Sequence, residues 1–266
     1  MRRITLLSIS LTLPAIAAAQ ATAPAFTGNF ALVSEYRFRG IDQTFGNPAV
    51  QGGVDYSHPS GVYLGNWNSN VSSGAGYPGG NLEMDFYGGY RGTSGDFGFD
   101  AGLIYYDYPG TDAGPQSNPL VQNNRTLAIH SGPIDNTEFY VGGSWKFLSL
   151  KYFHALGNYF SIPDTANTSY LDAAASFALG NGWGVNAHYG HLDLKGFNNG
   201  SYSDWKLGLK KEFARWIFGA EYVGTNAKGD CALNEPYCYS KGNGAPADSR
   251  RDAGRSTVVF SAGRSF

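Results

Sequence analysis

LEMDFYGGYRGTSGDFGFDAGLIYY, residues 82–106, contains two runs of alternating polar and apolar residues joined by a short turn. In the first run, Leu82, Met84 and Phe86 alternate with Glu83 and Asp85, so a β-strand would place the apolar side chains on one face and the carboxylates on the other. The second run repeats the pattern. A long segment rich in Gly, Asn, Ser and Pro follows at residues 107–135. The stretch predicts an antiparallel hairpin whose two faces meet different surroundings.

The connections between such runs alternate between short and long along the chain. Ser57–Ser60, Gly180–Gly182 and Phe213–Arg215 are tight turns, whereas Asp107–Asp135 and Thr225–Arg255 are long excursions. Tight turns at one end and long loops at the other are typical of transmembrane β-barrels. We therefore predict an all-β fold, an antiparallel transmembrane β-barrel of about twelve strands, with ten or fourteen left open by the less regular second, third and seventh strands. The predicted strands are Gly28–Arg39, Pro48–Ser57, Val62–Ser69, Leu82–Arg91, Phe97–Tyr106, Asn136–Phe147, Leu148–His154, Tyr170–Leu179, Trp183–Leu192, Ser203–Glu212, Trp216–Gly224 and Ser256–Phe266.

A soluble β-sandwich or a lipocalin-like barrel would show the same alternation with its apolar face inside. Aromatic residues near the strand ends favour the membrane, because they match the interfacial girdles of membrane barrels. The last strand ends on Phe266, which we interpret as a recognition signal for the barrel-assembly machinery. Arg264 departs from that signal, since it shares the lipid-facing parity of Phe266, but its long stem can reach the membrane interface.

The first 21 residues have the pattern of a secretory signal peptide. A basic start, Met1–Arg3, precedes the apolar run Ile4–Ile16 and the small residues Ala17–Ala21, and cleavage after Ala19 or Ala21 satisfies the small-x-small rule. An uncleaved membrane anchor is the alternative, but the run is short for a spanning helix. Residues 22–266 then form one barrel domain, which we expect in the outer membrane of a Gram-negative bacterium, in contact with its lipid.

Charge and cysteine content narrow the function further. Lys and Arg number 19 against 21 Asp and Glu, and loss of Arg2 and Arg3 with the signal leaves 17 against 21, which argues against a nucleic-acid partner. Cys231 and Cys238 predict a disulfide that closes a small loop, with two free thiols as the alternative. With the short turns periplasmic, the expected extracellular loops are Gly40–Asn47, Asn70–Asn81, Asp107–Asp135, Ala155–Ser169, Asp193–Tyr202 and Thr225–Arg255.

Residues 34–41, SEYRFRGI, and residues 48–67, PAVQGGVDYSHPSGVYLGNW, resemble the opening of the TorF family of Gram-negative outer-membrane proteins. The match is dense over about the first third of the chain after the signal and weaker beyond it. Asp42 stands where many members would have Ser, a departure without expected consequence. The resemblance implies an outer-membrane barrel with pore activity, and it implies no catalytic residue.

The sequence gives little support to a catalytic site or a metal site. His188 and His191 are three residues apart and so point to opposite faces of one strand, and His188 would face the lumen near Asp172. No motif places a nucleophilic Ser beside it, although an outer-membrane hydrolase stays open as an alternative. Acidic residues alternate along strands and do not cluster at metal-ligand spacing. We therefore expect no enzyme activity, no metal and no cofactor.

Charged residues at the alternate strand positions that face the lumen are the main candidate functional residues. They suit a porin-like passive channel for small polar solutes or ions, and an excess of acids, ten against six bases, predicts a weak cation preference. A structural or adhesive barrel with a plugged lumen is the alternative, since the same charges can pair across strands. Glu35, Arg37 and Arg39 are the expected constriction residues, and the oligomeric state is left open. The predicted pore-lining residues are Glu35, Arg37, Arg39, Asp55, Glu83, Asp85, Asp100, Glu138, Lys146, Lys151, Asp172, Asp204, Lys206, Lys210, Glu212 and Glu221.

Overall fold

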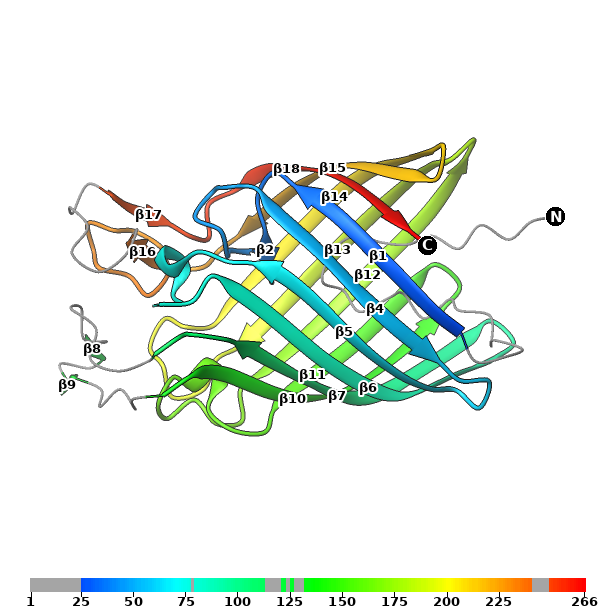
Figure 1. Ribbon diagram of the computed structural model, residues 1–266. Coiled ribbons are helices and arrows are strands. Elements are labelled where there is room, and N and C mark those ends of the chain that lie inside the picture. The colour runs from blue at the N-terminus through cyan, green and yellow to red at the C-terminus, as the bar shows by residue number, and fades with distance from the viewer. Residues whose placement is uncertain (1–24, 78, 113–120, 123–124, 127–131, 241–248) are drawn as a thin grey trace.

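The computed structural model describes residues 25–77, 79–112, 121–122, 125–126, 132–240 and 249–266. The predicted signal peptide and its cleavage sites lie outside these residues. Twelve strands form a closed antiparallel barrel in which sequential strands are neighbours (Figure 1). These strands are β1 (Ala25–Val33), β4 (Ala49–Ser57), β5 (Val62–Asn70), β6 (Leu82–Ser94), β7 (Phe97–Tyr108), β10 (Ile134–Trp145), β11 (Leu148–Ala155), β12 (Ser169–Gly180), β13 (Trp183–Asp193), β14 (Tyr202–Phe213), β15 (Trp216–Thr225) and β18 (Thr257–Ser265).

The barrel closes where β1 pairs with β18, for example Phe30 with Arg264 and Leu32 with Ala262. The predicted strand number and strand order are therefore confirmed, and most predicted bounds agree to within a few residues. Long connections carry the short elements β8 (Val121–Gln122), β9 (Arg125–Thr126), β16 (Cys238–Ser240), β17 (Arg250–Asp252), η1 (Ser73–Ala75) and η2 (Tyr159–Ser161). Figure 1 shows them at the end of the barrel opposite the tight turns.

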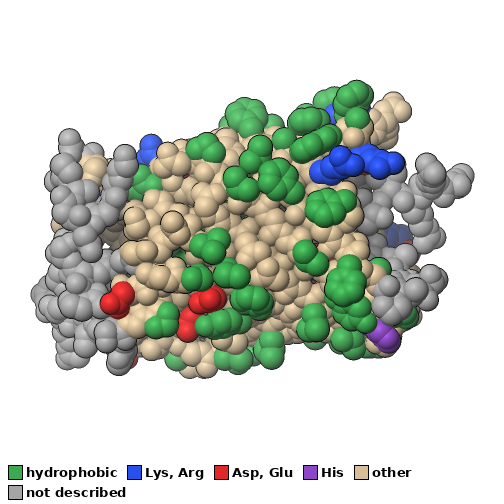
Figure 2. All heavy atoms as spheres, viewed as in Figure 1, with side chains coloured by type: hydrophobic (Ala, Val, Ile, Leu, Met, Phe, Trp, Pro, Cys, Tyr) green, Lys and Arg blue, Asp and Glu red, His purple; other side chains and the backbone are tan. Residues whose placement is uncertain are grey.

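The outer wall of the barrel is apolar. Leu207 and Leu64 on the wall are 60% and 59% exposed, while charged side chains on the face in Figure 2 gather toward the two ends. Aromatic residues mark the short-turn end, where Phe97 stacks on Trp145 at 6.4 Å and Phe147 lies 4.5 Å from Phe177. A soluble protein would not leave such a band in water while burying its charges. The band suits lipid, so the barrel spans a membrane.

In the part of the chain that the structure describes, no helix is long and apolar enough to cross a membrane.

The first predicted strand extends too far. We predicted Gly28–Arg39, but β1 ends at Val33, where the Ser34 hydroxyl accepts a hydrogen bond from the Phe260 amide. Residues 34–48, hereafter the inner loop, then fold into the barrel. They form the small hairpin of β2 (Arg37–Phe38) and β3 (Ile41–Asp42) around a tight turn at Arg39 and Gly40, both with positive φ. Residues 40–44 of the predicted extracellular loop Gly40–Asn47 are therefore buried in the barrel interior, and the segment is exposed again at Asn47.

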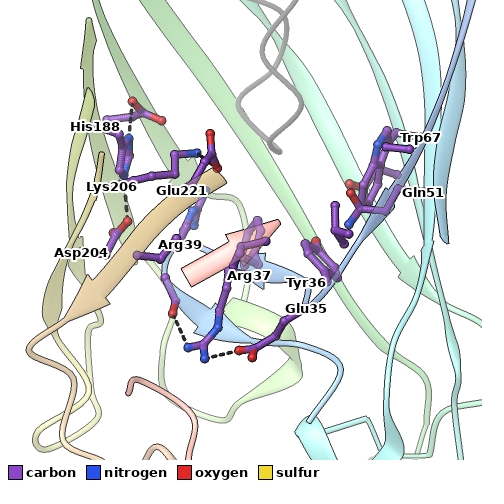
Figure 3. Close-up of a pocket in the computed structure, with 18 of the residues that line it drawn as sticks. Glu35, Tyr36, Arg37, Arg39, Gln51, Trp67, His188, Asp204, Lys206 and Glu221 are labelled. Carbon is purple, nitrogen blue, oxygen red and sulfur yellow. Dashed lines mark hydrogen bonds and ion pairs between the residues drawn. The ribbon is translucent and has the colours of Figure 1, made fainter. Parts of the chain in front are cut away.

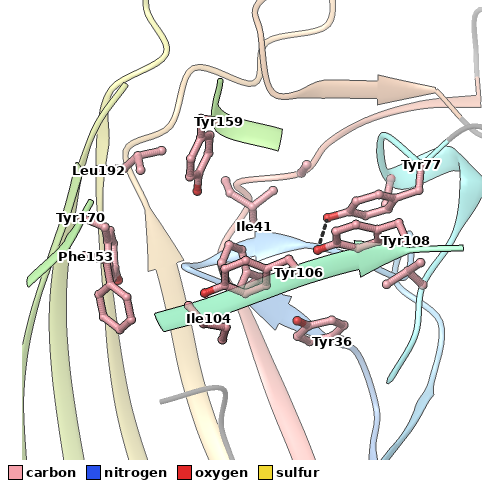
Figure 4. Close-up of a cluster of buried hydrophobic side chains, with 14 of the residues drawn as sticks. Tyr36, Ile41, Tyr77, Ile104, Tyr106, Tyr108, Phe153, Tyr159, Tyr170 and Leu192 are labelled. Atoms are coloured by element: carbon pink, nitrogen blue, oxygen red, sulfur yellow. Dashed lines mark hydrogen bonds between the residues drawn. The ribbon is translucent and has the colours of Figure 1, made fainter. Parts of the chain in front are cut away.

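A buried aromatic cluster fills the barrel around the inner loop (Figure 4). Phe38 packs edge-on against Tyr106 at 5.5 Å and against Phe160 at 5.7 Å, and Tyr77 stacks on Tyr108 at 4.2 Å. These side chains come from the inner loop, β7 and two of the long connections. The hydrophobic core of this protein therefore lies in the long-loop half of the lumen, and it holds the inner loop against the wall.

Candidate functional site in the barrel lumen

Most of the predicted lumen charges lie on the inner face of the wall. The register of each strand pair and the burial pattern place them inward, at alternate positions opposite the exposed apolar residues. Glu212 shares the inward parity but is exposed beside the turn after Phe213. The inward-facing residues are Asp55, Glu83, Asp85, Asp100, Glu138, Lys151, Asp172, Asp204, Lys206, Lys210 and Glu221.

Lys146 does not line the lumen. It occupies the tight turn after Trp145 with φ 54°, and its half-exposed ammonium lies 4.0 Å from the Asp96 carboxylate of the neighbouring turn. The predicted strand Asn136–Phe147 would place Lys146 on the inner face, but β10 ends at Trp145 and Lys146 lies in the turn. Glu35, Arg37 and Arg39 also differ from the prediction, because the inner loop carries them and the wall does not.

Arg39 fixes the tip of the inner loop to the opposite wall. Its guanidinium makes two hydrogen bonds, of 3.0 and 2.7 Å, to the Glu138 carboxylate on β10, and a third of 3.1 Å to the Tyr159 hydroxyl. The cation also lies 4.2 Å from the ring centroid of Tyr170. Burial raises the pKa of the Tyr159 hydroxyl to about 12, so this phenol stays neutral. Removing one partner of a buried pair of this kind costs about 3–5 kcal/mol.

Arg37 and Glu35 attach the inner loop to the segment before β18. Arg37 pairs with Glu35 and donates to the Ala253 carbonyl at 2.8 Å. Arg255 bridges Glu35 at 2.7 Å and Asp42 at 2.8 Å. Asp42 is therefore a buried anchor, and the expectation that its departure from the TorF pattern has no consequence is wrong. Arg255, in a long loop outside any alternating pattern, carried no local signal.

His188 joins two acids on the wall of β12 to β14. Its Nδ1 lies 3.3 Å from Asp172 and its Nε2 lies 2.8 Å from Asp204, which also accepts a 2.9 Å hydrogen bond from Tyr170. Beside them, Lys206 lies 3.6 Å from Glu221. The predicted proximity of His188 and Asp172 is thus present, and Asp204 is a further partner.

Tyrosines hold the acids on the other side of the lumen. Tyr63 donates to Asp100 at 2.5 Å, Lys151 pairs with the same carboxylate at 2.7 Å, and Tyr87 donates to Asp55 at 2.6 Å. We did not predict these tyrosines as site residues. The available signal was that they point inward on or beside strands that carry inward acids, because an inward phenol needs a polar partner.

A cavity of about 190 Å³ lies in the lumen next to the inner loop (Figure 3). Charged residues from both halves of the barrel line it, together with the inner loop itself. The acidic lining residues are Glu35, Asp55, Asp85, Asp172, Asp204 and Glu221, and the basic ones are Arg37, Arg39, Lys206 and Arg264. His188 also lines the cavity. Several of these groups already pair, so the cavity carries closely spaced charges of both signs.

The described residues offer little for hydrolysis. Ser203 Oγ lies 3.0 Å from His191 Nδ1 on the outer face, but Tyr189 donates to the same oxygen and no carboxylate among these residues bonds to His191. In the same described part of the chain, no group of three or more His, Cys, Asp or Glu residues is arranged for a metal ion. The site is thus a polar, charged chamber, partly filled by an inward-folded loop.

The family model described as "Bacterial protein of unknown function (Gcw_chp)" matches residues 17–266. The chain belongs to the Gcw_chp family. No curated protein matches this Gcw_chp chain. The TorF resemblance stays a prediction.

Several solved barrels are similar to this Gcw_chp protein in architecture. A KdgM porin shares 8% identity over 90% of this chain and 98% of its own, with a TM-score of 0.49. A NanC porin shares 9% identity over 91% and 99%, with a TM-score of 0.46. OmpT of Vibrio cholerae shares 14% identity over 91% and 97%, with a TM-score of 0.41. Since the likeness is distant, the function of the Gcw_chp chain has to be inferred from its own lumen.

Proposed function

We propose that this protein is a porin-like passive channel for small polar solutes or ions in the bacterial outer membrane, with a weak preference for cations and no enzymatic activity. The observation that carries the proposal is the charged cavity inside an apolar-walled barrel. A barrel that served only as a scaffold could fill its interior with apolar side chains. Here the inward positions hold ion pairs and hydroxyls, which can replace the water shell of a permeating ion.

The inner loop supplies a constriction in this proposal. It narrows the lumen, and Asp172, Asp204 and Lys206 of the wall line the cavity beside it, so a solute would pass along charges of both signs. The six lining acids outnumber the four lining Lys and Arg residues by two, which is the basis for the weak cation preference. The barrel would reach the membrane through the assembly machinery.

A planar bilayer containing the purified protein tests the proposal. Wild type should give discrete conductance steps. Arg39→Met with Glu138→Gln removes both charges that hold the tip of the inner loop and should raise conductance a few-fold, because the loop loses its attachment to β10. Lys151→Met with Asp100→Asn is the matched control, since it removes a lumen ion pair of 2.7 Å that does not involve the inner loop. Equal effects of the two double variants would contradict the assigned constriction.

A plugged structural barrel is the second candidate. The specific observation in its favour is the buried aromatic cluster, in which Tyr108 and Tyr140 are essentially inaccessible. If wild type is silent in the bilayer and only the variant without the Arg39–Glu138 pair conducts, the plugged barrel replaces the open channel as the better description.

A further inference from the structure

Two carboxylates inside the barrel have no counter-ion among the described residues. Glu83 and Asp85 are neighbours on the inner face of β6, and each is 0% exposed. None of their four carboxylate oxygens accepts a hydrogen bond of regular geometry, although the hydroxyls of Tyr36 and Tyr108 lie beside Glu83. Other lumen acids differ, since Asp100, Glu138 and Asp204 each contact a cation or a histidine. The pair therefore stands out from the surrounding network.

The surroundings of this pair increase its negative potential. The Glu138 carboxylate lies near enough to Asp85 to act on it electrostatically, while its own countercharge, Arg39, is fully engaged with Glu138. Burial of an uncompensated carboxylate is very unfavourable, and two adjacent ones repel each other. The folded barrel is therefore stabilised when a cation or a proton neutralises this pair.

A third oxygen comes from the inner loop. The hydroxyl of Tyr36 is buried and lies close to Glu83 and Asp85, with Glu83 beside it as the available acceptor. This neutral oxygen can serve as a ligand to a cation or accept a hydrogen bond from a water bound to it. Tyr36 is labelled among the cavity-lining residues in Figure 3 and among the buried aromatic residues in Figure 4. Three oxygen-bearing side chains from two elements thus meet with no basic side chain paired to them.

We propose that Glu83, Asp85 and Tyr36 form a binding site for one divalent cation of the calcium type, which attaches the inner loop to β6. Carboxylate and neutral oxygens are the ligands that Ca²⁺ prefers, and it accepts waters at its remaining positions. Access is provided from the cavity, which Asp85 and Tyr36 both line. The site involves two side chains of the wall and one of the inner loop, and it does not depend on whether the barrel transports solutes.

Thermal unfolding of the folded full-length protein in detergent tests the site. After treatment with EDTA, CaCl₂ alone should raise the Tm of wild type by several degrees. Tb³⁺ should give emission sensitised by the neighbouring tyrosines, and Ca²⁺ should displace it. Glu83→Gln with Asp85→Asn should abolish both responses and should raise the Tm in EDTA, because two uncompensated charges are removed. Asp172→Asn, in a lumen acid that contacts His188, should keep both responses.

Tyr36→Phe keeps the ring and removes only the third oxygen, so it should weaken Ca²⁺ binding several-fold without changing the Tm in EDTA. Two results would overturn the proposal. One is a wild-type Tm that does not respond to Ca²⁺ together with no sensitised Tb³⁺ emission, which would indicate that the two carboxylates share a proton. The other is a Ca²⁺ response of equal size in wild type and in the Glu83→Gln, Asp85→Asn variant.

Discussion

Adjacent residues of one strand meet opposite surroundings in this barrel. On β14, Leu207 is 60% exposed on the outer wall, while Lys206 points inward to Glu221. Leu207 pairs with Ala187 and Tyr222 near the middle of the strands, so its side chain lies near the centre of the apolar band. A change of one position in the sequence therefore exchanges lipid for the lumen.

Leu207→Arg should reduce the free energy of unfolding in a lipid bilayer by about 2–4 kcal/mol, the cost of a cation on the lipid face at the midplane. Lys206→Gln should have a small effect, since Glu221 keeps its 2.9 Å hydrogen bond from Asn186. Denaturant titration in vesicles measures both values. Equal losses at the two positions would show that the assignment of the inner and outer faces is wrong.

At the residue scale, the sequence predicted the direction of most wall residues but not their partners. Alternation told us that Asp172 and His188 point inward, because their strands are regular. It could not indicate that Arg255 reaches Glu35 and Asp42, more than 200 positions earlier. Such contacts depend on how a long loop returns into the barrel, which no local period encodes.

At the scale of elements, the β14–β15 hairpin has an unusual turn. Phe213 pairs with Trp216 across a two-residue loop, in which Ala214 and Arg215 both have positive φ, 50° and 67°. Two-residue hairpins of this type favour Asn-Gly, because side chains other than Asn, Asp and Gly are strained there. Ala214→Asn with Arg215→Gly should therefore stabilise the barrel by about 1 kcal/mol in equilibrium unfolding. Any destabilisation would indicate that these side chains contribute contacts that outweigh the strain.

The disulfide predicted from the sequence is confirmed, with Cys231 bonded to Cys238. It closes a short loop between β15 and β16, so its contribution to stability is at most about 2–3 kcal/mol. Cys231→Ser with Cys238→Ser should leave the unfolding of the barrel nearly unchanged but increase the rate at which a protease cleaves this loop. A large loss of barrel stability would mean that the loop is part of the folded core.

The inner loop shows where element prediction failed. Residues 34–39 continue the alternation of β1, with Tyr36 and Phe38 opposite Glu35, Arg37 and Arg39, so the pattern alone indicates a longer strand. In the structure Tyr36 and Phe38 are buried in the lumen and do not face lipid. A short hairpin inside a barrel has the same period as a strand in its wall. The difference lies in contacts with Tyr106 and Glu138, which are distant in the sequence.

At the scale of the whole molecule, strand number, strand order and loop rhythm could all be predicted, because a closed barrel imposes them on the entire chain. The filling of the lumen could not, because it depends on side chains from many strands. Glu83 and Asp85 illustrate this. Both side chains point inward, as their position in the alternating pattern predicts, yet both are fully buried. Replacing them with Lys would therefore change the stability of the folded barrel more than its ion selectivity.

Selectivity is better tested with acids that line the cavity and keep contact with solvent. Asp55 and Asp172, on β4 and β12, meet these conditions. If the barrel conducts as proposed, Asp55→Asn with Asp172→Asn removes the surplus of two lining acids and should bring the reversal potential in a KCl gradient close to zero. The measurement is made with EDTA present, so that no divalent cation contributes charge. The preference of wild type should fade toward 1 M salt, where the screening length falls to about 3 Å.

Asp96→Asn with Asp193→Asn is the matched control, because both carboxylates are substantially exposed near the two ends of the barrel, and this variant should leave the potential unchanged. A reversal potential that responds equally to both double variants would indicate that surface charge, not the lumen, sets the preference.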